Sequence, residues 1–350
     1  MSRRKWFQML VVTVVTACLL VFSGLASGQG NSANAFERVK EVQERHTDEL
    51  MARAGVVGTA VGEDESDQLV VLVLLEHDAV PGIPPQLEGI SVRRLVTGKI
   101  EALPKGGKPG GGGSTYSPTS RWPRPVPIGV STGHPAITAG TIGCRVKSGS
   151  TLYALSNNHV YANANQATVG DAVIQPGTYD GGTSPADDIA QLHDFRQISF
   201  DGSNNTIDAA IATIEPISRT DDRPRVDNAT PSNGYGIPSQ TTVAAYIRQP
   251  VQKYGRTTSL TKGRVYALNA AVNVSYGDLN GDGQDEVAHF VGQIIITAGH
   301  FSAGGDSGSL IVTQSGNNPV GLLFAGSNSI TIANPIDLVL SYFGVTVDGQ

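Results

Sequence analysis

The stretch FSAGGDSGS, from Phe301 to Ser309, places one aspartate and three serines among small residues near the end of the chain. Glycine is abundant throughout, with 42 Gly in 350 residues, so a flexible surface loop is one interpretation. The other is a backbone cradle that holds Ser307 for chemistry, because glycines permit tight turns in which backbone N–H groups converge. The choice depends on whether the chain supplies the partners that a reactive serine needs.

A serine hydroxyl is a weak nucleophile near neutral pH, so it needs a base within hydrogen-bond reach and a carboxylate that orients the base. Of the seven histidines, His159 ends the apolar stretch TLYALSNNH, where a β-barrel can hold a side chain rigidly at its edge. The others lie on a predicted helix, near turns, on a strand or beside the serine loop: His46, His77, His134, His193, His289 and His300.

Two aspartates compete for the role of orienting carboxylate. Asp208 stands at the head of the apolar stretch NTIDAAIATI, which would bury it partly. Asp188, in DDIAQL, follows His159 by 29 residues, against 49 for Asp208. The residues alone leave both candidates open.

Short segments of β type, separated by turn residues, fill residues 126–350. Many short strands at this spacing predict an all-β barrel or a pair of sandwiches. The clearest segments are AITAGTIGCRV, TLYALSNNH, IDAAIATI, GRVYALNAAVNVSY, VAHFVGQIIIT and PVGLLFAG.

Residues 31–103 predict a separate, small α+β unit. A capping box and apolar residues at helical spacing indicate a helix over 34–54, which Gly55 ends. The Gly- and Pro-rich residues 104–125 are a predicted linker, since they cannot bury enough apolar surface to fold. Strands of the small unit are expected at 55–62, 68–76 and 89–103.

Residues 1–29 have basic residues, then an apolar run, then small residues, which is the layout of a secretory signal peptide. Two alternatives are a retained membrane anchor, since the run approaches the roughly 17–25 residues of a membrane span, and lipid attachment at Cys18. The protein is expected to be secreted or periplasmic, away from the membrane once the leader is removed. Cys144 is then the remaining cysteine, so no intramolecular disulfide forms.

The order His159, Asp208, Ser307, within SNNHV, NTIDAAIA and GGDSGS, resembles the chymotrypsin–trypsin family of serine peptidases. The separations of 49 and 99 residues suit that family and favour Asp208 over Asp188. KYGRTTSLTKGRV, at 253–265, is similar to a segment of the second barrel in secreted bacterial members such as the streptogrisins. The resemblance covers most of the chain after the predicted linker.

The resemblance implies a double six-stranded β-barrel of chymotrypsin type, preceded by the α+β domain. It implies a secreted serine endopeptidase that works through an acyl-enzyme, with Ser307 as nucleophile and His159 as general base and then acid. Asp208 would orient the imidazole, and the backbone N–H groups of Gly305 and Ser307 would form the oxyanion hole.

The family also suggests a substrate pocket. Phe301 stands six residues before the nucleophile, at the position that forms the pocket floor in the family. With no charge there, we expect an apolar or small substrate side chain rather than Lys or Arg. Phe324 and Gly326, in the strand PVGLLFAGS, are expected to flank the substrate. Family members bridge a cysteine at the position of Cys144 to the residue after the histidine, which is Val160 here, so Cys144 is expected in the core.

Two features bear on activation. The residue at the position of Asp306 pairs, in animal digestive members, with an amine freed by cleavage; no clean equivalent is visible here, so Asp306 is expected to bond locally. The unit at 31–103 is expected to be a pro-segment that assists folding or blocks the cleft, which would make the chain a zymogen. The alternative is an accessory domain that stays attached.

The stretch DLNGDGQDE resembles the front of an EF-hand calcium loop, although His289 takes the place of the glutamate at its twelfth position. The loop either binds a structural calcium ion or is an acidic, solvated turn, and the sequence leaves both alternatives open. Neither would take part in hydrolysis, and no cofactor is expected for that reaction. The candidate ligands are Asp278, Asn280, Asp282 and Glu286.

The net charge of −6 argues against a nucleic-acid partner, because such partners demand a basic face. The expected partner is a protein or peptide substrate, acted on by a monomer. The alternative function is a catalytically inactive peptidase homologue that serves as a binding or adhesion protein. An esterase of the α/β-hydrolase fold does not fit, because that fold needs strand–helix alternation and places Ser before Asp before His.

Overall fold

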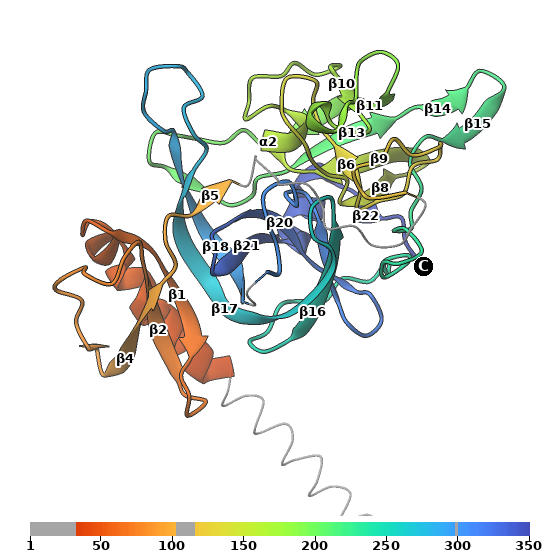
Figure 1. Ribbon diagram of the computed structural model, residues 1–350. Coiled ribbons are helices and arrows are strands. Elements are labelled where there is room, and N and C mark those ends of the chain that lie inside the picture. The colour runs from red at the N-terminus through yellow and green to blue at the C-terminus, as the bar shows by residue number, and fades with distance from the viewer. Residues whose placement is uncertain (1–32, 103–115, 298–299) are drawn as a thin grey trace, which may run out of the picture.

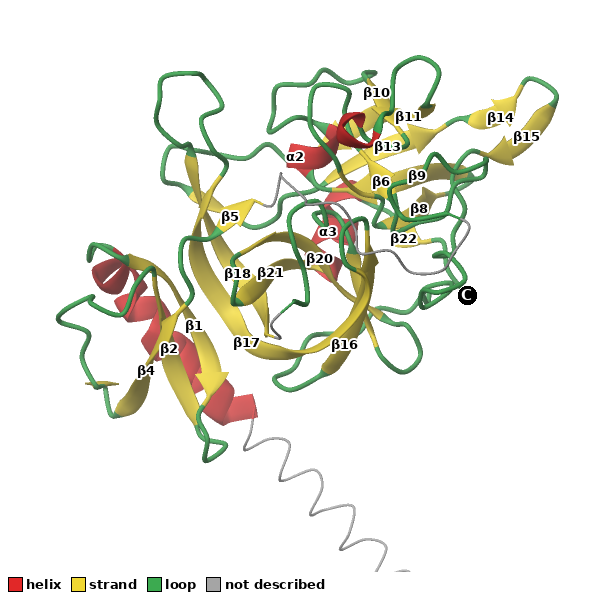
Figure 2. Ribbon diagram, in the orientation of Figure 1, coloured by secondary structure: helices red, strands yellow, loops and turns green. Residues whose placement is uncertain are grey.

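The computed structural model describes residues 33–102, 116–297 and 300–350, and the chain is mostly β with few helices (Figures 1 and 2). The predicted signal peptide at 1–29 and most of the predicted linker at 104–125 lie outside these residues. Within the described part, no helix is long and apolar enough to span a membrane.

The N-terminal unit consists of helical residues 33–51 and a small sheet. The helix buries Val39, Val42 and Leu50 against one face of that sheet. The sheet has the order β1-β2-β4-β3, in which β2 and β4 are parallel. Its strands are β1 (Val56–Glu63), β2 (Leu69–Leu75), β3 (Gln86–Leu87) and β4 (Ile90–Val96).

Strand β2 is apolar along its whole length because both of its faces are buried. Val71, Val73 and Leu75 pack toward the helix, whereas Val70, Leu72 and Leu74 join a second buried cluster with residues of the following domain. A strand that faces water on one side alternates between apolar and polar residues, and a strand covered on both sides does not. The N-terminal sheet is therefore sandwiched between its helix and the rest of the molecule.

The N-terminal sheet continues into the next domain through backbone pairing. Strand β1 pairs antiparallel with β17 (Ser259–Ser275), with Gly58 opposite Val272 and Thr59 opposite Ala271. A Cβ on Gly58 would lie 2.5 Å from the carbonyl oxygen of Ala271, so this close approach requires glycine. The helix and β1, β2 and β4 lie together beside β17 in Figure 1.

Six strands of the C-terminal half close into a ring. Each of the six pairs with two other strands of the ring, and the pairing of β17 with β18 completes the circuit β18-β21-β20-β19-β16-β17. The interior is apolar and includes Val251, Ile296, Phe301 and Leu323. Besides β17, the strands are β16 (Pro250–Gly255), β18 (Val287–Thr297), β19 (Leu310–Thr313), β20 (Pro319–Gly326) and β21 (Ile330–Pro335).

The other half holds a six-stranded sheet in the order β10-β11-β13-β9-β8-β22, which the described pairings leave open between β10 and β22. The predicted mostly-β class is therefore confirmed, but the two halves are one closed ring and one open sheet rather than two closed barrels. Cys144 is fully buried in the core beneath this sheet. Its strands are β8 (Cys144–Ser148), β9 (Thr151–Ser156), β10 (Ala172–Ile174), β11 (Asp188–Phe195), β13 (Ala210–Ile214) and β22 (Thr346–Val347).

Shorter elements complete the chain. Two of them matter for the site: the four-residue helix α2 (Asn158–Tyr161), which follows β9, and strand β5 (Glu101–Ala102), which leaves the N-terminal unit. The others are β6 (Ser131–Thr132), β7 (Gly140–Thr141), β12 (Asn204–Asn205), β14 (Pro216–Ser218), β15 (Asp221–Pro224), the 3-10 turn at Thr178–Asp180 and helix α3 (Ile336–Phe343).

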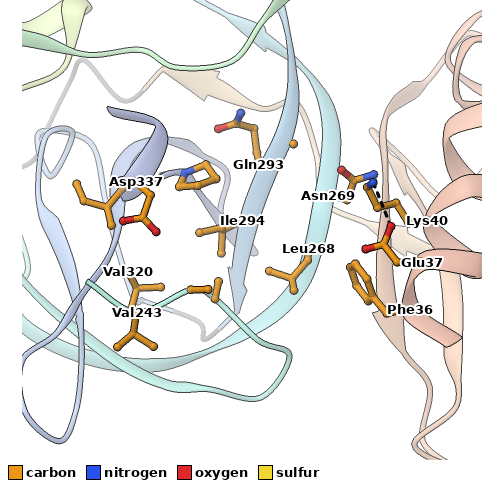
Figure 3. A pocket seen from close by; sticks show the side chains of 15 residues that line it. Phe36, Glu37, Lys40, Val243, Leu268, Asn269, Gln293, Ile294, Val320 and Asp337 are labelled. Atoms are coloured by element: carbon orange, nitrogen blue, oxygen red, sulfur yellow. Dashed lines mark hydrogen bonds and ion pairs between the residues drawn. The ribbon is translucent and has the colours of Figure 1, made fainter. Parts of the chain in front are cut away.

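A pocket of about 250 Å³ lies between the N-terminal helix and the closed ring. Figure 3 shows Phe36 of the helix and Leu268 of β17 facing each other across it, with Ile294 of β18 further along. None of the residues that line it is His159 or Ser307. The pocket is therefore a gap at the junction of the two units and is separate from the predicted catalytic residues.

Candidate active site

His159 and Asp208 meet in the buried interior between the two halves. His159 lies on α2, and its Nδ1 is 2.6 Å from Oδ2 of Asp208. The backbone N–H of His159 also donates to Oδ1 of Asp208, at 3.3 Å. Asp208 is fully buried and His159 is 8% exposed. The two contacts fix the imidazole relative to the carboxylate.

The backbone of Asp208 is held by two buried asparagines. Its N–H donates to Oδ1 of Asn334 on β21, at 3.2 Å, and its carbonyl oxygen accepts from Nδ2 of the same residue at 3.0 Å. Nδ2 of Asn157, two residues before His159, also donates to that carbonyl oxygen, at 2.8 Å. The carboxylate is thus positioned from both halves of the molecule at once.

The competing aspartate, Asp188, is elsewhere. It begins β11, and its backbone carbonyl oxygen accepts hydrogen bonds from Arg124 at 2.9 Å and Arg225 at 2.7 Å. Of the two aspartates that the sequence left open, the structure brings Asp208 to His159.

Tyr276 is a third member of this cluster, and the sequence did not single it out. Its hydroxyl donates to Oδ2 of Asp208 at 2.8 Å, and its ring meets that of His159 edge-on, with centroids 5.9 Å apart. Burial, and then the charge of Asp208, raises the pKa of Tyr276 well above its usual value, so the hydroxyl keeps its proton. Asp208 therefore has two side-chain partners, an imidazole and a phenol.

Ser307 is fully buried in the turn that precedes β19. Its Oγ donates to the carbonyl oxygen of Phe324 on β20, at 3.3 Å. Its own carbonyl oxygen accepts from Thr141 N at 2.8 Å. A Cβ on Gly140 would lie 3.1 Å from that carbonyl oxygen and 2.5 Å from Val160, the neighbour of His159. The serine turn and α2 thus pack on the same strand.

The Nε2 atom of His159 is the second relevant atom of the imidazole. It is buried, and it makes no hydrogen bond with any of the residues that the structure describes. A buried polar atom without a partner is costly, and such atoms are frequent at functional sites. Because Nδ1 is committed to Asp208, Nε2 is the nitrogen left to exchange a proton.

Two glycines of the serine turn have backbone conformations that favour glycine, since both Gly305 and Gly308 have φ of +92°. A Cβ on Gly305 would lie 2.7 Å from Oγ1 of Thr257 and 2.8 Å from Nη1 of Arg256. A Cβ on Gly308 would overlap Ser156 Oγ and the carbonyl oxygen of Thr141. The glycines of this turn are therefore required by its shape and its neighbours.

Asp306 holds the serine turn through local hydrogen bonds, as the sequence predicts. Its carboxylate accepts hydrogen bonds from the N–H groups of Thr257 at 2.8 Å and Ala303 at 3.0 Å, and from Oγ1 of Thr258 at 2.7 Å. The sequence missed its charged partner: Nζ of Lys253 is 3.4 Å from Oδ2, and both side chains are fully buried. Burial lowers the pKa of Lys253, which the charge of Asp306 opposes.

Of the predicted pocket residues, Phe301 and Phe324 are buried in the core, whereas Gly326 lines a cleft. Phe301 is 1% exposed, lies in the interior of the closed ring and is not among the residues that line the cleft beside Gly326, so its role as a pocket floor stays a prediction. Phe324 is also fully buried. Gly326 does line an open cleft of about 740 Å³. The other lining residues include Ser302, Ala303, Gly304, Asn328, Ser275, Tyr276, Glu101 and Ala102.

The acidic loop after β17 is stabilised by hydrogen bonds between its own residues. The Asp278 carboxylate accepts from the N–H groups of Gly281 at 2.6 Å and Gly283 at 2.9 Å, and Glu286 accepts from Leu279 N at 2.6 Å. Over the described ranges, no three His, Cys, Asp or Glu residues gather in a way that could hold a metal ion. Calcium binding by this loop stays a prediction.

No family model matches the sequence, and neither does any curated protein. Among solved structures, protease A of Thermobifida fusca is 20% identical, with 64% of this chain and 99% of that one covered and a TM-score of 0.44. A chymotrypsin of Cellulomonas bogoriensis is 17% identical, with 64% and 99% covered and a TM-score of 0.42. A protease specific for glutamic acid is 23% identical, with 63% and 100% covered and a TM-score of 0.41. These likenesses are distant, so the function proposed for this chain rests on its own residues.

Proposed function

We propose that the protein is a serine endopeptidase that hydrolyses peptide bonds through an acyl-enzyme on Ser307. The observation that carries the proposal is the buried 2.6 Å contact between His159 Nδ1 and Asp208 Oδ2, which leaves Nε2 buried without a hydrogen-bond partner among the described residues. An imidazole held in this way can act as a base only through Nε2. The order of these residues in the chain and the glycines of the turn support the same role.

In the proposed reaction, Ser307 Oγ attacks the scissile carbonyl carbon while His159 Nε2 takes the hydroxyl proton. Asp208 accepts the Nδ1–H hydrogen bond throughout and stabilises the imidazolium that forms. The N–H groups of Gly305 and Ser307 donate to the oxyanion of the tetrahedral intermediate, and the protonated His159 then gives its proton to the leaving amine. Water releases the acyl group by the same steps in reverse.

The Asp306 contacts support a turn that keeps this shape without a new N-terminus. Lys253 supplies the positive charge beside Asp306 from within the ring, on β16. Beneath the same turn, the guanidinium of buried Arg256 pairs with Asp180, with 2.7 Å between Nη2 and Oδ1. In this proposal, activation therefore requires no cleavage that frees an amine for Asp306.

We propose that the full-length chain is nevertheless a precursor, because β5 fills the groove between β20 and β17 and forms part of the wall of the cleft. Ala102 pairs with Ala325 and Glu101 with Gly326, in an antiparallel arrangement on the strand that carries Phe324. In Figure 1, β5 stands apart from β1, β2 and β4. Removal of this segment would widen the cleft and free the backbone groups of β20 that pair with β5. We further propose that the protein is a monomer that works outside the cytoplasm, in accordance with the leader predicted from the sequence.

A fluorophosphonate probe tests the proposal, because it reacts with an activated serine and does not need a peptide substrate. The parent chain and an Ile100→Asp variant, designed to displace β5, are each compared with the same chain carrying Ser307→Ala. We expect covalent labelling that is faster in Ile100→Asp and absent wherever Ser307 is replaced. A folded Ile100→Asp variant that does not label would instead favour the inactive homologue that serves as a binding or adhesion protein.

A further inference from the structure

We propose that the groove between β17 and β20, which β5 fills in the full-length chain, selects extended peptides with a basic residue, a branched aliphatic residue, any residue and a small residue in succession. The basis is the chain's own segment Lys99–Ala102, which the groove holds as a bound peptide would be held. This inference rests on the proposed peptidase function and adds the class of substrate to it.

The backbone of this segment is bound from both sides. Strand β5 pairs antiparallel with β20 on one side and parallel with β17 on the other, where Glu101 stands opposite Ser275. The N–H of Ser275 donates to the carbonyl oxygen of Ile100 at 3.0 Å. Insertion of an extended strand between two others uses main-chain hydrogen bonds for affinity and leaves specificity to the side chains.

The segment runs toward the proposed nucleophile. Glu101 pairs with Gly326 and Ala102 with Ala325, so the chain advances toward Phe324. The carbonyl oxygen of Phe324 accepts the Ser307 hydroxyl. A peptide bound in this register therefore presents its carboxyl-terminal end to Ser307, as a substrate must.

Alternate side chains of the segment have opposite environments, as in any strand. Ile100 and Ala102 are 1% and 2% exposed, and both belong to the buried cluster that contains Tyr276 and Phe324. Glu101, between them, is exposed. The groove thus has an apolar site of the size of isoleucine and a smaller site filled by alanine, and it leaves the intervening position to solvent.

The first residue of the segment, Lys99, is recognised through its charge. Lys99 Nζ forms an ion pair with Oδ2 of Asp285, which also accepts from Ser275 Oγ at 2.8 Å. The hydrogen bond from Lys99 lowers the pKa of Asp285, and the same bond raises the pKa of Lys99. The loop at 277–286 has four acidic residues and no Lys or Arg, so a cation on the peptide meets no competing cation within the loop.

The experiment uses the full-length Ile100→Asp chain, in which a carboxylate at the apolar site displaces β5. Its labelling by the fluorophosphonate is followed in the presence of acetylated pentapeptides. The reference peptide, Lys-Ile-Glu-Ala-Leu, repeats the sequence from Lys99 to Leu103. We expect it to slow labelling in a saturable manner.

Three altered peptides test the separate positions. Replacing its isoleucine by aspartate should weaken protection by about 10-fold or more, since a buried aliphatic side chain is lost. Replacing its lysine by glutamate should weaken protection about 2- to 5-fold at low salt, as for an exposed ion pair, with the difference shrinking as salt is added. Replacing its glutamate by lysine should change protection less than about twofold, because that position is exposed.

The charge preference has its own control. Adding Asp285→Lys to the same chain should reverse the preference between the lysine and glutamate peptides. If Ile100→Asp does not fold, Lys99→Glu in the otherwise unchanged chain should raise the labelling rate, and a second change, Asp285→Lys, should lower it again.

The outcomes separate the groove from the chemistry. Labelling that no peptide slows, or that all four peptides slow equally, overturns the groove and leaves the peptidase proposal intact. A folded chain of either design that is not labelled at all overturns the peptidase proposal, and the substrate class with it.

Discussion

Tyr276→Phe tests the part of the site that the sequence did not reveal. The substitution removes one hydroxyl from a buried position and keeps the ring, which meets His159 edge-on. The lost hydrogen bond ends on a fully buried carboxylate. Hydrogen bonds to charged groups contribute about 1.5–3 kcal/mol. If Asp208 must be held while the imidazolium forms, that loss corresponds to a decrease in kcat of about 10- to 150-fold.

The assay compares kcat and KM on a peptide ester, together with the fluorophosphonate labelling rate, in the full-length Ile100→Asp chain. We expect kcat and the labelling rate to fall and KM to stay within about twofold, because the hydroxyl lies behind the imidazole, on the carboxylate. Tyr254→Phe is the matched control, since it removes another buried tyrosine's hydroxyl, bonded to Asn233 at 2.9 Å. Equal rates in Tyr276→Phe and its parent, or equal losses in both tyrosine variants, would refute the reasoning.

Three further predictions concern stability. Gly308→Ala should cost at least about 3 kcal/mol, from left-handed strain plus overlap, whereas Gly202→Ala, with φ of +87° and open space, should cost about 1 kcal/mol; chemical denaturation measures both. Lys253→Met leaves a buried carboxylate unpaired and should cost about 3–5 kcal/mol by the same measurement, and an unchanged midpoint would exclude the pair. Burial raises the pKa of Tyr161 and of Tyr276, so their contribution is complete below the unfolded pKa near 10 and is lost at higher pH, by about 1.4 kcal/mol per pH unit each. Ultraviolet titration should show both phenols still protonated until the chain unfolds.

The catalytic candidates could be found in the sequence because each stands in a short motif with its own physical reason. His159 ends an apolar strand, Asp208 opens another, and Ser307 lies among glycines whose positive φ the structure explains. The choice between Asp208 and Asp188 was beyond the residues alone. It depended on a family resemblance, and the structure agrees in that Asp208 is the one that contacts His159.

Tyr276 and Lys253 could not be found in this way. Each contacts an aspartate that is more than fifty residues away in the sequence. A single tyrosine or lysine in or beside a strand forms no sequence pattern that predicts a buried partner. Phe301 is buried among aliphatic side chains inside the closed ring, which its position in the motif did not show. Its role as the floor of a substrate pocket stays a prediction.

The N-terminal unit is less separate than its composition suggests. Its predicted last strand, at 89–103, is two elements in the structure: β4 stays in the unit and β5 crosses to the cleft. Strand β2 buries one face against residues of the closed ring, so the two units share a core. A sequence shows that a strand is apolar on both faces, but it does not show which part of the chain covers the second face.

The most direct test of the account is intact mass, followed by peptide mapping, after the full-length Ile100→Asp chain has reacted with a fluorophosphonate. The account predicts one adduct per chain, on Ser307, and no adduct when Ser307→Ala or His159→Ala is added. An adduct on another residue, or a folded chain that stays unmodified while Ser307, His159 and Asp208 are all present, would contradict it.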